Sequence, residues 1–107
     1  MDSKTYQKIS KLAPDLPYFK GHFPQFPVVP AVAFFNLSQS YIEEWQLKKL
    51  SLVQAQSWRF KKSLTPNCPF IFEAELIEKT KPIYQVRWLT ADEKKETIAV
   101  GLLQFLS

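Results

Sequence analysis

The sequence contains few of the residue types that build metal and redox sites. Its 107 residues include one cysteine, one histidine and two glycines. Cys68 has no second cysteine to pair with, which is typical of a protein from a reducing compartment. One cysteine and one histidine are too few for a Cys/His zinc site, and the sequence has no phosphate-binding loop. We therefore expect no metal, nucleotide or flavin.

Long apolar runs are also missing. Charged residues and prolines interrupt every hydrophobic stretch, so no segment is long enough to form a membrane-spanning helix. The polar start at residues 1–4 lacks the apolar region of a signal peptide, and we expect a cytoplasmic protein. The content of 46% hydrophobic and 15% aromatic residues is sufficient for a packed core. We interpret residues 1–107 as a single domain.

The charge is moderately basic, with a formal net charge of +4. Lysines are spread along the whole chain, and acidic residues lie between them from Glu73 onward. Neither a dense basic face nor a nucleic-acid-binding motif is visible, which argues against nucleic acid as the partner. The charge is compatible with an acidic protein partner.

Residues 19–32 are the most distinctive stretch. They hold the only histidine, one of the two glycines and three of the eight prolines. Five prolines between Pro14 and Pro30 favour an extended, stiff loop, since each proline fixes its own φ and restricts the preceding residue. His22 is expected to be held rigidly in this loop.

The remaining segments predict one helix followed by strands. Proline suits the start of a helix, and apolar residues after Pro30 recur at steps of three and four. Alternating apolar and polar residues predict strands over 50–60, 70–76, 84–88 and 98–102, with turn residues between them. For residues 4–13, the pattern leaves a short strand and a helical turn open. We predict an α+β fold in which an antiparallel sheet wraps around one long helix. The predicted buried face of this helix consists of Ala31, Phe34, Phe35, Ser38, Ile42 and Trp45.

The loop and the start of the helix resemble a known enzyme family. The motif Gly-His-Phe-Pro at residues 21–24, followed by Pro-Val-Val-Pro-Ala-Val at 27–32, is similar to the signature of the hotdog-fold 3-hydroxyacyl-[acyl-carrier-protein] dehydratases. Residues 59–67 are similar to the family's strand that enters a Pro-Gly-Asp turn. In length the chain resembles the short dehydratases found with aryl-polyene gene clusters. The resemblance covers residues 16–106.

This resemblance implies an activity, a substrate and a partner. The family consists of hydro-lyases that act on a 3-hydroxyacyl thioester, carried on the phosphopantetheine arm of an acyl carrier protein. It implies a hotdog homodimer with one continuous sheet, in which the histidine of one subunit faces an acidic residue on the other subunit's helix. His22 would be the base, and the substrate-binding positions would be Gly21, Phe23, Pro30, Ala31 and Val32. Carrier proteins are acidic, which agrees with the basic charge.

The family's acidic residue is not present in this sequence. It is expected fourteen positions after His22, where this chain has Asn36. An amide can hold a hydroxyl group or a water molecule but delivers no proton, and loss of a general acid typically costs on the order of 10² to 10⁴ in rate. Glu43 lies on the same predicted helix, about 10 Å farther along its axis. Its carboxylate is therefore a poor substitute for the missing acid, unless the substrate sits deeper than expected.

Several hypotheses are compatible with these residues. The chain could be a dehydratase of reduced activity, in which His22 also returns the proton, or it could share its site with a different hotdog subunit that supplies the acid. It could bind carrier-linked chains without turnover, or be a hotdog thioesterase. Structural alternatives are a hydrogen-bonding role for His22, a loop-capping role for Asn36, core packing of Phe34 and Phe35, and an ordinary turn position for Cys68.

Overall fold

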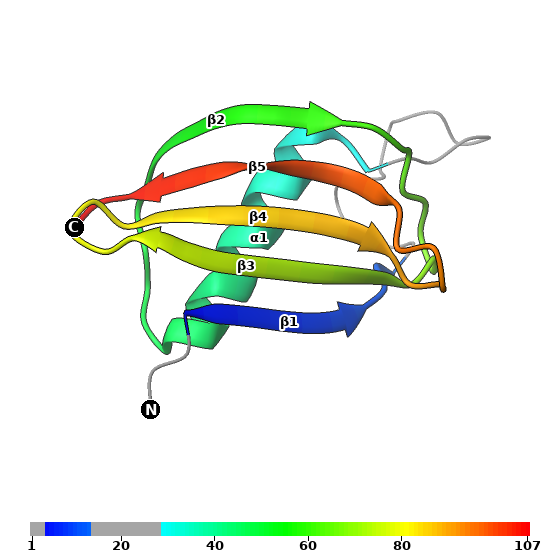
Figure 1. Cartoon of the computed structure of the whole chain (residues 1–107), viewed down its shortest axis with the longest axis horizontal. Coiled ribbons are helices and arrows are strands. Elements are labelled where there is room, and N and C mark those ends of the chain that lie inside the picture. Colours follow the sequence, from blue (N-terminus) through cyan, green and yellow to red (C-terminus); the bar gives the residue numbers. More distant parts are fainter. Residues whose placement is uncertain (1–3, 14–28) are drawn as a thin grey trace.

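The computed structural model describes residues 4–13 and 29–107. These contain one helix, α1 (Ala31–Gln46), and one antiparallel sheet in the order β1-β3-β4-β5-β2. The helix crosses one face of the sheet, and β1 and β2 form the two edges (Figure 1). The predicted helix and the four strands that follow it are confirmed, and residues 4–13 contain an edge strand. The strands are β1 (Thr5–Ser10), β2 (Leu52–Phe60), β3 (Phe70–Glu78), β4 (Ile83–Thr90) and β5 (Thr97–Phe105).

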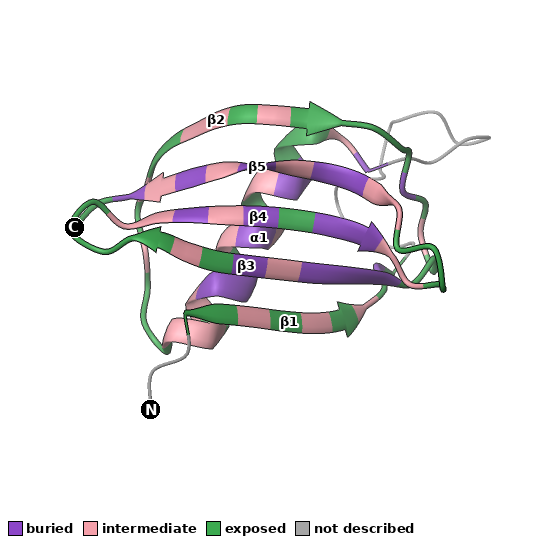
Figure 2. Ribbon diagram, viewed as in Figure 1, coloured by how far each residue is buried: buried purple, intermediate pink, exposed green. Residues whose placement is uncertain are grey.

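Alternation along the central strands decides which side chains face the helix. Phe72 on β3 pairs with Trp88 on β4, and both side chains are fully buried against α1. Their neighbours Glu73 and Arg87 point to the opposite face of the sheet. The core therefore lies between α1 and strands β3, β4 and β5, where Figure 2 shows most of the buried residues.

The buried face of α1 differs from the predicted one at its beginning. Ala31 is exposed, whereas Ala33 is completely buried and Tyr41 joins the core. Ala31 is wrongly predicted because it stands at the very start of the helix, where the sheet does not cover it. Phe34 is buried, and Phe35 is partly buried against Trp58 at a ring distance of 5.0 Å. Core packing of these two phenylalanines is confirmed.

A bulge in the edge strand β2 places Trp58 over Gly101. Gln56 pairs with Leu102 and Arg59 with Val100, so that Ser57 and Trp58 together oppose Gly101. Ser57 has a φ of 59°, and the Trp58 indole N–H donates to the Leu102 carbonyl at 3.0 Å. A Cβ on Gly101 would lie 2.3 Å from Trp58 Cδ2. Only glycine leaves room for the indole at this position.

Within residues 4–13 and 29–107, no helix is long and apolar enough to cross a membrane. The same residues contain no group of three or more His, Cys, Asp or Glu side chains that could hold a metal ion.

Candidate functional site

The start of α1 supplies backbone donors that no side chain of the described residues caps. Pro30 precedes the helix in an extended conformation, without a side-chain cap, and the first turn contains no acidic residue. The first N–H groups of any α-helix have no acceptor inside the helix, and the helix dipole favours negative charge there. The N–H groups of Ala31 and Val32 are therefore suited to bind an oxygen that carries partial negative charge.

Alanine fits at position 31, where the family resemblance has glycine. Ala31 is the first helical residue, and it is not among the residues with positive φ. Its side chain is exposed rather than packed against the core. Alanine in place of glycine therefore causes no backbone strain at position 31. It only adds a methyl group beside the Ala31 N–H.

A hollow of about 300 Å³ opens beside this end of the helix. It lies between the start of α1 and the end of β2. Its apolar side includes the buried ring of Phe34 and the ring of Phe60, with 5.5 Å between ring centroids. Phe60 is 47% exposed, so an apolar surface remains open to a ligand. The residues that line the hollow are Val29, Ala31, Phe34, Phe60, Lys61, Lys62 and Ser63.

The rim of the hollow is basic. Lys62 forms an ion pair with Glu96 at 2.7 Å, and this hydrogen bond to the carboxylate raises the pKa of Lys62. Lys61 has no acidic partner among the described residues. Its ammonium group is thus available to an anion that approaches the hollow.

Asn36 does not face this hollow in its own chain. At about 100° per residue, it lies roughly on the opposite side of α1 from Phe34, which lines the hollow. Asn36 is exposed, as are Val32 and Ser40 one turn away on either side. Its side chain forms no hydrogen bond with the described residues, so a loop-capping role finds no support there. A hydrogen-bond partner for the Asn36 side chain would come from outside residues 4–13 and 29–107.

Glu43 has a structural role. One carboxylate oxygen accepts the backbone N–H of Leu50 at 2.8 Å, while Gln39 donates to the Leu50 carbonyl at 2.8 Å. The two side chains hold the connection from α1 to β2. The prediction that Glu43 does not replace the missing acid is consistent with this arrangement.

The predicted site residues are only partly within the described structure. Gly21, His22 and Phe23 lie outside the described residues. Pro30, Ala31 and Val32 are together at the start of α1, as predicted. Cys68 is exposed in the turn before β3. Sequence reasoning missed the hollow and Phe60, Lys61 and Lys62, although an aromatic residue and two lysines at the end of a predicted strand were a usable signal.

Sequence comparisons connect the chain with dehydratases. Residues 1–101 match the ApeI-like family, described as ApeI dehydratase. The 3-hydroxyacyl-[acyl-carrier-protein] dehydratase FabZ of Oceanobacillus iheyensis is 34% identical over 74 residues, which are 63% of this chain and 53% of the relative. The chain thus matches about half the length of that relative.

Comparisons with solved structures identify the hotdog fold. A chain of the dehydratase heterocomplex ApeI:P from Xenorhabdus doucetiae superposes with a TM-score of 0.82 at 21% identity, over 97% of this chain and 88% of that chain. The PaaI protein of the Escherichia coli phenylacetic acid degradation operon gives 0.70 at 13% identity, over 100% and 79%. The predicted α+β hotdog fold, one helix against an antiparallel sheet, is confirmed.

Proposed function

Because the chain belongs to the ApeI-like dehydratase family, we propose that it acts on 3-hydroxyacyl thioesters carried by an acyl carrier protein, with His22 as the base. The observation that carries this proposal is the family match over residues 1–101, which includes the Gly-His-Phe-Pro motif. The uncapped start of α1 beside an apolar hollow gives further support. The reaction is the loss of water to form a trans-2-enoyl thioester.

The dehydration requires removal of a proton from carbon 2 and loss of the hydroxyl from carbon 3. The His22 imidazole, whose ordinary pKa is near neutral, takes the carbon-2 proton. The N–H groups of Ala31 and Val32 stabilise the charge that develops on the thioester oxygen. The imidazolium then returns the proton to the departing hydroxyl, so that water leaves and His22 is neutral again. Asn36 supplies no proton and can only orient the hydroxyl.

The position of Asn36 favours a site completed by a second subunit. The face of α1 that carries Asn36 also exposes 54% of Val32, and the edge strand β2 exposes 55% of Val53. A hotdog subunit covering this surface would place its own loop against Asn36. A second copy of this chain would give a homodimer whose two sites both lack the acid.

A second candidate function is therefore a shared site with a different, acid-bearing hotdog subunit. The absence of a carboxylate at position 36 favours this candidate, and the similar Xenorhabdus structure is a dehydratase heterocomplex. In such a pair, His22 of this chain and a carboxylate of the partner would form one competent site. The site formed by Asn36 and the partner's loop would have no acid of its own.

Lys61 and Lys62 suit an acidic carrier protein. They border the hollow that would receive the pantetheine arm, and the whole chain carries a net charge of +4. Opposite charges around an entrance raise the association rate of a charged partner.

The test uses the purified full-length protein and a 3-hydroxyacyl-carrier-protein, with water loss followed by mass spectrometry. Turnover that disappears in His22→Ala supports the dehydratase. If Asn36→Glu is more active than the unmodified protein, the missing acid limits the rate of dehydration. Ser40→Glu is the matched control, because it adds a carboxylate one helical turn farther along the same exposed face.

The remaining outcomes separate the alternatives. If the unmodified protein is inactive alone but active when mixed with an acid-bearing hotdog subunit, the shared site is supported. Carrier binding without turnover, alone or in mixtures, supports a binding role. Release of free acid and thiol would identify a thioesterase and contradict the proposal.

A further inference from the structure

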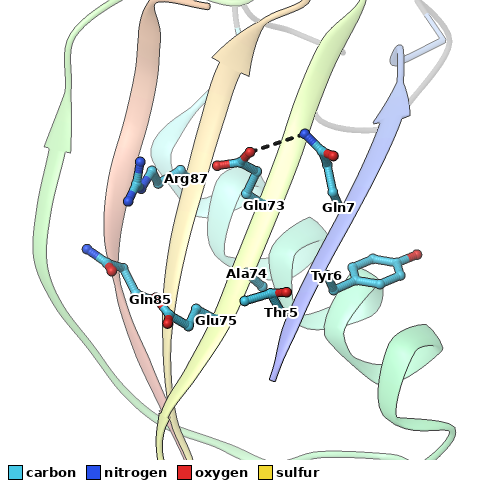
Figure 3. A pocket seen from close by; sticks show the side chains of 8 residues that line it. All are labelled: Thr5, Tyr6, Gln7, Glu73, Ala74, Glu75, Gln85 and Arg87. Atoms are coloured by element: carbon cyan, nitrogen blue, oxygen red, sulfur yellow. Dashed lines mark hydrogen bonds between the residues drawn. The ribbon is translucent and has the colours of Figure 1, made fainter. Parts of the chain in front are cut away.

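The outer face of the sheet, opposite α1, carries two glutamates on β3 beside one arginine on β4. Glu73 and Glu75 lie on β3, and their register partners on β4 are Arg87 and Gln85. Figure 3 shows these side chains on the face that points away from α1. Together with Thr5, Tyr6, Gln7 and Ala74, they line a groove of about 310 Å³.

Glu73 and Arg87 are direct neighbours that do not pair. Glu73 instead accepts a hydrogen bond from the Gln7 side chain at 3.1 Å, and Arg87 extends away from Glu73 (Figure 3). The ion pairs of the described residues join Lys8 to Glu44 and Lys62 to Glu96. The exposed guanidinium of Arg87 therefore has no acidic partner in the described part of the chain, although a carboxylate stands on the adjacent strand.

We propose that this outer face binds the same face of a second copy of the chain, across a two-fold axis that runs along the strands between β3 and β4. This rotation places β3 of each copy opposite β4 of the other. Because Glu73 and Arg87 are register partners, each Glu73 stands opposite Arg87 of the other copy. The next pair along the strands sets Glu75 opposite Gln85.

The side chains are long enough for this arrangement. Arg87 extends from β4 away from Glu73, and Gln7 reaches from β1 to the Glu73 carboxylate (Figure 3). Packed sheets lie about 10 Å apart, a gap that extended Glu and Arg side chains bridge together.

The charges also select this axis over its alternative. A two-fold axis perpendicular to the strands would place β3 opposite β3 and β4 opposite β4. Glu73 would then face Glu73 or Glu75 of the other copy, which is repulsive, and Arg87 would face Arg87 or Gln85, neither of which is a carboxylate. A face of roughly 20 Å by 28 Å on each copy buries about 1,100 Å² in total, the size of a weak, reversible interface.

The test compares charge reversals by sedimentation equilibrium of the full chain. Arg87→Glu alone and Glu73→Arg alone place like charges together, and each is expected to weaken the association at least about tenfold. An equimolar mixture of the two variants should associate as the wild type does. In a mixed pair, Glu73 of one copy faces Arg87 of the other, and the two introduced charges, which are opposite, face each other. Contacts within one chain cannot produce this recovery. Raising the salt concentration from about 0.1 M to about 1 M should dissociate the wild type toward the mass of the single variants.

Matched controls change the same charge elsewhere. Lys79→Glu in the β3–β4 hairpin and Glu93→Lys in the β4–β5 hairpin should leave the mass unchanged. The inference is overturned if wild type and both reversals have the same mass at every concentration, if the mixture does not recover, or if the controls dissociate equally. Dehydration activity is not part of the readout, so failure of the proposed function and failure of this interface are separate results.

Discussion

The Trp88 indole N–H donates a hydrogen bond of 2.9 Å to the Ser38 hydroxyl across the interface between α1 and β4. Both residues are completely buried, and Ser38 is the one buried polar residue among those described. The indole ring stacks with Phe70 at 4.6 Å and meets Phe34 edge-to-face at 4.8 Å. This pair fixes how the helix is rotated on the sheet.

Replacing Ser38 by alanine should destabilise the fold. Ser38→Ala leaves the Trp88 N–H buried without an acceptor, at an expected cost of about 1–3 kcal/mol in the free energy of unfolding. The measurement is urea unfolding followed by tryptophan fluorescence. Ser40→Ala, on the exposed side of the same helix, should change stability by less than about 0.5 kcal/mol. Equal stability of Ser38→Ala and the wild type would show that the hydrogen bond contributes nothing.

A side chain at position 101 should displace Trp58. The methyl group of Gly101→Ala would overlap the indole, and relief of such overpacking costs about 1–3 kcal/mol. A second change, Trp58→Leu, removes the overlapping ring. The cost of Gly101→Ala should therefore be smaller in the Trp58→Leu background than in the wild type. Additive effects of the two substitutions would contradict the close approach of the two residues.

Much of the fold could be predicted from local patterns. Alternation over 70–76 and 84–88 identifies the buried residues of β3 and β4, because each strand has one face on the core. The strand at residues 5–10 could not be assigned, since a spacing of three residues between Tyr6 and Ile9 suits a helix equally well. Pairing with β3 decides the outcome: Tyr6 stacks on Trp45 at 5.5 Å, while Ile9 is 70% exposed.

The candidate site was predictable only where it is contiguous in sequence. The motif and a count of fourteen positions locate Asn36, but whether Asn36 faces its own hollow depends on the rotation of α1 against the sheet. Likewise, the hollow requires the end of β2 to lie beside the start of α1. Phe60 and Ala31 are far apart in sequence, and no local pattern brings them together.

The β4–β5 turn should lose stability in acid through Asp92. Thr90 Oγ1–H donates to Asp92 at 2.7 Å, and the Lys95 backbone N–H donates to the same oxygen at 3.0 Å. The Thr90 hydroxyl, and then this backbone N–H, lower the pKa of Asp92 below its usual value. A lowered pKa in the folded state means that the stabilisation is present above the unfolded pKa of about 3.9 and is lost as the pH falls through the folded value.

Asp92→Asn keeps an acceptor but does not titrate. The wild type should therefore be more stable than Asp92→Asn at pH values above about 4, and the difference should disappear as the pH falls below that. Thermal unfolding at several pH values measures this difference. Glu93→Gln, an exposed neighbour for which no comparable hydrogen bond is present among the described residues, should show no such pH dependence. A constant difference at all pH values would exclude Asp92 as the titrating group.

Lys61 should recognise the carrier protein rather than the acyl chain. On the proposed function, Lys61→Glu replaces a cation at the rim of the hollow, without an acidic partner among the described residues, with an anion that repels an acidic carrier. An exposed ion pair contributes up to about 1 kcal/mol, so the KM for a carrier-linked substrate should rise roughly five-fold with little change in kcat. The same variant should process a free pantetheine thioester, which lacks the carrier's acidic surface, as the wild type does. Lys48→Glu, just beyond the other end of α1, is the matched control and should leave both KM values unchanged. A loss of kcat with both substrates would instead indicate that Lys61 supports the structure of the site.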